Sequence, residues 1–188
     1  IITDMLARLD EVFLQRDKLK LEEVTMMDDK VDILNEAILE YLSEVRQHPL
    51  TDRQSSEFQS LMSATINLES LADIIETDLS AIGKDYLNSD MQPSDTTRML
   101  LRELGEKVVL AVGTLIRAIR ENDENAAAGV IAMKDEIRHL ADAALQRQTE
   151  RIAVREPQHL ALIQLEMEIL EHLRRIYTLA KRVAREFV

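Results

Sequence analysis

Apolar side chains recur every three or four residues along almost the whole chain, which is the spacing of one face of an α-helix. Turn-forming residues interrupt this pattern at four places: around Pro49, at 88–95, at 121–123 and at 156–157. The segments between the interruptions predict six long helices. Their expected ranges are about 1–18, 21–47, 52–88, 94–121, 124–152 and 157–188.

Two of these segments carry apolar stripes in which steps of three and four residues alternate, as in helices that pack side by side along their length. We expect both stripes to be buried. The first consists of Val24, Met27, Val31, Leu34, Ile38, Tyr41 and Val45. The second consists of Leu61, Thr65, Leu68, Ala72, Ile75, Leu79, Ile82 and Tyr86.

Helix-capping residues stand at the expected starts. Thr51 or Asp52 can cap the third segment, Ser94 or Asp95 the fourth, and Pro157 suits the first turn of the last. Because the connections are short, neighbouring helices must run antiparallel. The predicted fold class is therefore all-α, an elongated bundle of six long helices.

The two halves of the chain are similar to each other. A shift of 106 residues aligns 24–34 with 130–140, and a shift of 102 residues aligns 68–74 with 170–176. A repeat of this length predicts two tandem three-helix bundles packed together. The predicted repeats are residues 1–90 and 91–188.

The amino-acid composition excludes several classes of function. Apolar residues make up 46% of the chain, enough for a core, and the absence of cysteine excludes disulfides, thiolate zinc sites and cysteine nucleophiles. A net charge of −12 argues against a nucleic-acid partner, since such proteins need a basic surface. No Gly-rich phosphate loop, Gly-x-Ser-x-Gly or His-Glu-x-x-His motif is present, so we expect no enzyme activity.

Two short acidic motifs share one spacing. In each, an acid is followed four residues later by an aspartate, so both carboxylates lie on one side of the helix, one turn apart. The motifs hold the same heptad positions and lie at nearly the same distance from the turn at Pro49. In an antiparallel pair they therefore lie at nearly one level. The motif residues are Asp28 and Asp32 in one helix and Glu69 and Asp73 in the next.

Four converging carboxylates repel one another unless a cation joins them. Mg, Mn, Ca and iron take oxygen ligands, so a metal site is one interpretation. The other is a solvated helix face, because the chain has 35 acidic residues. In the second half the equivalent positions are mostly basic, which confines any metal site to the first half and suggests salt bridges or a docking face there. These positions are Lys134, Arg138, Glu171 and Arg175.

The segments 27–38 and 67–73 resemble the paired acid-x-x-x-Asp signature of PhoU-type domains. The resemblance extends over the whole chain, including six helices in two three-helix repeats. It implies a role in controlling phosphate uptake, without catalytic residues or an organic cofactor. It also implies a metal cluster of iron, zinc, Mg or Mn. The ligands that the resemblance implies are Asp28, Asp32, Glu69 and Asp73.

The ending at 170–184 looks more like the cytoplasmic tail of a sodium/phosphate cotransporter, and Ile1 in place of an initiator Met favours the same branch. The alternatives are a free-standing regulator of phosphate uptake and a metal-free helical scaffold. The expected partners are a membrane phosphate transporter, in the same polypeptide or a separate one, and a second copy in a homodimer. The expected location is the cytoplasm, tethered at the inner face of the membrane by an N-terminal transporter part.

Overall fold

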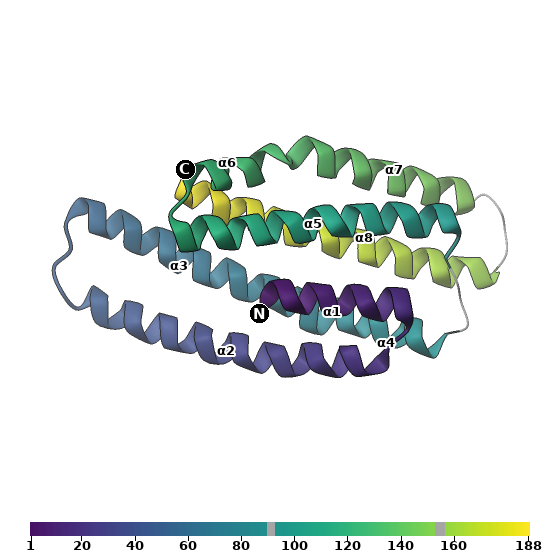
Figure 1. The fold of residues 1–188 in the computed structure, drawn as a ribbon, viewed down its shortest axis with the longest axis horizontal. Helices are drawn as coiled ribbons and strands as arrows, with labels where there is room; N and C mark the ends of the chain where they lie inside the picture. The colour runs from purple at the N-terminus through teal and green to yellow at the C-terminus, as the bar shows by residue number, and fades with distance from the viewer. Residues whose placement is uncertain (90–92, 153–156) are drawn as a thin grey trace.

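The structure, a computed structural model, describes residues 1–89, 93–152 and 157–188, and every element within these ranges is helical (Figure 1). The elements are α1 (Ile2–Gln15), α2 (Lys18–Arg46), α3 (Asp52–Asp73), the π-helix η1 (Ile74–Leu79), α4 (Ser80–Asn88), α5 (Asp95–Glu121), α6 (Glu124–Ala132), α7 (Lys134–Ile152), α8 (Pro157–Ala184) and the 3₁₀-helix η2 (Arg185–Phe187).

The expected all-α class and its six long helices are confirmed. In the described part of the chain α3, η1 and α4 run on as one rod, and Met133 alone separates α6 from α7. Thr51 caps α3 through a capping box, and Ser94 caps α5. The predicted boundary between residues 90 and 91 lies outside the described residues. No helix within the described ranges is long and apolar enough to cross a membrane.

The first helix ends earlier than expected, at Gln15, because Arg16 adopts a left-handed conformation with φ 55° and Asp17 then caps α2. The same turn recurs a shift of 106 residues later. There Asn122 has φ 50°, and the Asp123 side chain accepts hydrogen bonds from the first amides of α6. Two turns of equal geometry at this spacing support the internal repeat that the sequence alignment indicates.

One continuous apolar core joins the two halves. It contains residues of α1, η1 and α4 together with residues of α5, α6, α7 and α8. α8 packs against both α3 and α5, and α1 packs against α5. Fully buried members include Leu115 of α5 and Ile176 of α8. The two halves therefore share one core and do not form two separate domains.

Part of the predicted stripes is not buried. Val24 is fully buried, but Leu34, Ile38 and Tyr41 are 50%, 43% and 64% exposed, and Leu61 opposite them is 44% exposed. The free end of the α2–α3 hairpin extends beyond the rest of the bundle, while α1 covers the other end of α2 (Figure 1). The prediction was wrong for these residues because α1 begins at their level and does not cover them: its first residues only border a hollow that Leu34 and Ile38 also line.

Candidate metal-binding face

The α2–α3 hairpin brings the two acidic motifs face to face. Burial raises the pKa of Asp28 to about 6, and the negative charges of Asp32 on the same helix and Asp73 on α3 add to the rise. Burial also raises the pKa of Glu69, and Asp73 and Asp32 contribute to that rise. Carboxylates perturb one another across two helices only when they lie close together. The number of residues between each motif and Pro49 therefore predicted correctly that the two motifs lie at one level of the hairpin.

Asp73 completes the cluster. Burial raises its pKa, and the charges of Asp32 and Glu76 raise it further. In the described part of the chain, no lysine or arginine offsets the rise in Asp28, Glu69 or Asp73. We call the acidic face the set formed by Asp28, Asp32, Glu69, Asp73 and Glu76.

The donor set suits a hard cation, because all its atoms are carboxylate oxygens. One of them, Oδ1 of Asp28, is buried and has no hydrogen-bond partner. Within the described residues, however, no three His, Asp or Glu side chains are arranged to hold one metal ion. Asp32 and Asp73 are exposed. Exposed side chains change rotamer rapidly, so a metal ion could draw these two carboxylates into a coordination shell.

The PhoU domain model matches residues 1–77 and 101–187, which together make up most of the chain. This chain belongs to the PhoU domain family. No curated protein matches its sequence.

Two solved PhoU structures share this fold. PhoU from Pseudomonas aeruginosa superposes with a TM-score of 0.90 at 16% identity, covering 99% of this chain and 88% of that one. The phosphate transport system regulatory protein PhoU from Streptococcus pneumoniae gives 0.85 at 14% identity, covering 100% and 86%. At such identities the likeness establishes the fold alone.

Glu76 is a member of the acidic face of this PhoU domain that the motif search did not identify. It lies on η1, where its Oε1 accepts a hydrogen bond from the Thr25 hydroxyl of α2 at 3.2 Å and its Oε2 one from Thr77 at 2.9 Å. A signal was present in the sequence, because Glu76 follows Glu69 by one heptad. π-helical turns are frequent at functional sites.

At the equivalent positions of the second half, the PhoU chain forms salt bridges between neighbours along each helix. Arg138 pairs with Asp135 at 3.1 Å, and Glu171 pairs with Arg174 at 3.7 Å. All four side chains are largely exposed, so each pair stabilises the fold by less than about 1 kcal/mol. Lys134, the counterpart of Asp28, is also exposed.

One acid of the first half pairs with a basic position of the second. Asp78 on η1 lies 3.3 Å from Nδ1 of His172 and 3.7 Å from Nη1 of Arg175, both on α8. The π-helix thus carries Glu76 toward the acidic face and Asp78 toward the second half. Arg175 is the equivalent of Asp73, so a position that is acidic in one repeat serves as a cross-repeat contact in the other.

Proposed function

We propose that this PhoU-domain chain is an accessory, non-catalytic regulator of phosphate transport and that its acidic face binds a divalent metal ion. Family membership supports the regulatory part, and the streptococcal protein of the same fold is named a phosphate transport system regulatory protein. The metal part depends on carboxylates from two motifs that converge without a compensating cation.

The acidic face suggests how metal binding would act on the protein. Asp28 and Asp32 would supply ligands from α2, and Glu69 and Asp73 from α3, with Glu76 beside them on η1. A bound divalent ion supplies positive charge between mutually repelling carboxylates. The two helices would then be held at a fixed spacing, and the charge of the ion would offset part of the negative charge of the surface offered to a transporter.

More specifically, we propose that the chain is the cytoplasmic part of a sodium/phosphate cotransporter. The resemblance of the ending at 170–184 supports this assignment. A free-standing regulator is the alternative, supported by the two PhoU structures that the chain covers over 88% and 86% of their length. An antibody against this domain separates them on a blot of native cells. We expect a membrane-bound band much larger than this chain, whereas a soluble band of its own size would favour the alternative.

Elemental analysis tests the metal proposal. The purified chain is incubated with Fe, Zn, Mg or Mn ions, desalted and analysed beside a variant with Asp28→Asn, Asp32→Asn, Glu69→Gln and Asp73→Asn. We expect stoichiometric metal in the parent and none in this variant. The matched control removes four acids outside the acidic face, by Asp85→Asn, Glu103→Gln, Asp142→Asn and Glu168→Gln, and should keep its metal.

Equal metal content in the parent and the acidic-face variant would overturn the proposed site. The absence of metal from every sample would make the chain a metal-free helical scaffold, the remaining interpretation of its sequence.

A further inference from the structure

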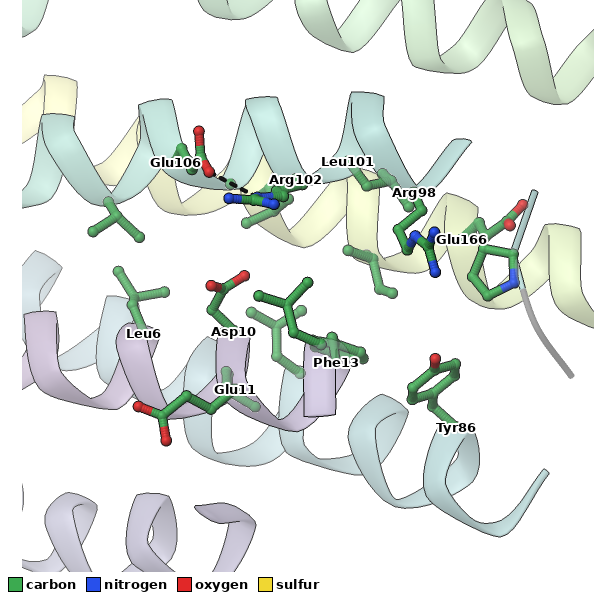
Figure 2. Close-up of a pocket in the computed structure, with 18 of the residues that line it drawn as sticks. Leu6, Asp10, Glu11, Phe13, Tyr86, Arg98, Leu101, Arg102, Glu106 and Glu166 are labelled. Atoms are coloured by element: carbon green, nitrogen blue, oxygen red, sulfur yellow. Dashed lines mark hydrogen bonds and ion pairs between the residues drawn. The ribbon is translucent and has the colours of Figure 1, made fainter. Parts of the chain in front are cut away.

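A cavity of about 450 Å³ lies where α1 of the first half meets α5 and α8 of the second (Figure 2). This volume lies within the usual range of small-molecule sites. At one end, the rings of Phe13 and Tyr86 lie 5.7 Å apart. The rest of the wall is mainly aliphatic. The aliphatic lining includes Leu6, Leu9, Leu101, Val109, Ile169 and Leu173.

Gly105 of α5 also lines this cavity. A glycine inside a helix costs roughly 1 kcal/mol relative to alanine, and close packing often explains its presence. Here it does not, because a Cβ atom on Gly105 would meet no heavy atom within 4 Å. Its position leaves open space against the wall, which a bound molecule would fill and a larger side chain would block.

Most charged groups around the cavity already have partners. Arg102 pairs with Glu106 at 2.8 Å, the one ion pair that Figure 2 marks. Arg98, whose guanidinium lies at the cavity edge, pairs with Asp95 at 2.6 Å. The fully buried Glu166 is paired with Arg151 of α7. Only Oε1 of Glu166 among these paired groups is a buried oxygen without a hydrogen-bond partner in the described part of the chain.

Asp10 differs from these paired groups. It projects from α1 into the space between α1 and α5 (Figure 2), and within the described residues it forms no ion pair or hydrogen bond. Burial raises the pKa of its carboxyl; Arg102 lowers it, and Glu106 and Glu11 raise it. Arg102, whose guanidinium lowers this pKa, is already paired with Glu106. This end of the cavity therefore carries an excess of negative charge.

We propose that the cavity binds an aliphatic molecule bearing a protonated primary amine, with its hydrocarbon chain along the aliphatic wall and its ammonium group at Asp10. The aliphatic part removes apolar surface of both partners from water. The ammonium donates charge-assisted hydrogen bonds to the carboxylate of Asp10, which forms no ion pair with any described residue. An anionic head would instead face that uncompensated negative charge. The acidic face takes no part, so this site and the metal proposal stand or fall separately.

Calorimetric titration of the full chain with octylamine tests the proposal, with octanol and octanoate as probes of the head group. We expect saturable binding of octylamine at one site, at least tenfold tighter than binding of octanol and tighter still than that of octanoate. Asp10→Asn should weaken octylamine about tenfold and leave octanol unchanged. Gly105→Leu should weaken octylamine and octanol alike, by tenfold or more.

Two control variants distinguish a blocked cavity from an unfolded protein. Gly129→Leu makes the same change at a helical glycine that also has nothing within 4 Å of an added Cβ, and Asp142→Asn removes a charge from the exposed face of α7. Both should bind octylamine like the parent, and circular dichroism should show every variant folded. Octanoate affinity equal to that of octylamine, unchanged binding by folded Gly105→Leu, or no saturable binding would each overturn the proposal.

Discussion

The two halves of this PhoU-domain chain repeat one helix order and differ in how completely it is packed. In the second half α5 has 27 residues and contributes fully buried core residues along much of its length. Its counterpart α1 has 14 residues beside an α2 of 29. The same apolar periodicity therefore produces a buried stripe in α5 and a partly exposed one in α2, because burial requires a third helix alongside.

The halves also differ in charge at equivalent positions. The acidic face concentrates carboxylates whose charges raise the pKa of Asp28 and that of Asp73. The basic replacements at Arg138 and Arg175 instead form ion pairs, the second of them with Asp78 across the repeat. A duplicated helical unit can thus present an acidic surface in one copy and a contact surface in the other without a change in backbone design.

The largest expected difference is between a leucine of α5 and a leucine of α2. Leu115→Ala in α5 should lower the free energy of unfolding by about 2–5 kcal/mol, because Leu115 is fully buried and its removal leaves a cavity. Leu34→Ala in α2 should lower it by less than about 1 kcal/mol, since Leu34 is 50% exposed. Urea denaturation measures both. Equal losses would mean that another segment covers the free end of the α2–α3 hairpin in solution.

Metal binding should stabilise the parent through its first half. At a free ion concentration 100 times Kd, mass action adds about 2.7 kcal/mol to the free energy of unfolding. The variant with Asn or Gln at Asp28, Asp32, Glu69 and Asp73 should show no thermal shift with any divalent ion. A full shift in that variant would move the metal site elsewhere in the molecule.

The two left-handed turns should respond differently to substitution. Nη2 of Arg16 donates to the carbonyl oxygen of Tyr86 at 2.8 Å and to that of Leu87 at 3.3 Å, at the end of α4. Arg16→Asn keeps a residue that tolerates positive φ but loses these bonds, and should cost about 1.5–3 kcal/mol. Asn122→Ala should cost about 1 kcal/mol through backbone strain alone. Thermal denaturation compares them, and an equal loss would contradict the linking role of Arg16.

The smallest effect is that of pH on the acidic face. Folding raises the pKa of Asp28 from 3.8 to about 6, so the folded state binds the extra proton and its stability rises as pH falls through that window. At pH 7 Asp28→Asn should therefore be more stable than the parent, by roughly 0.5 kcal/mol after allowance for solvent screening. Near pH 4 the difference should vanish. If the free energies of unfolding of parent and variant change equally with pH, folding does not raise the pKa of Asp28.

Much of this molecule could be predicted from local information. Helix ranges follow from apolar periodicity and from caps such as Thr51 and Ser94, because these interactions join residues a few positions apart. The pairing of the Asp28 motif with the Asp73 motif also follows from counting, since one tight turn sets the register of an antiparallel hairpin. The repeat was indicated by the alignment of 24–34 with 130–140, and the two left-handed turns recur at the spacing of that alignment.

The remaining features arise from contacts between segments distant in the chain. Leu34 has the sequence context of a core residue, and the reach of α1 leaves it exposed. Glu76 belongs to the acidic face, and it accepts a hydrogen bond from Thr25 on another helix. The cavity beside Asp10 exists because α1, α5 and α8 meet without filling the space at Gly105. Periodicity specifies which face of a helix is apolar, whereas the lengths and positions of the other helices decide what covers that face.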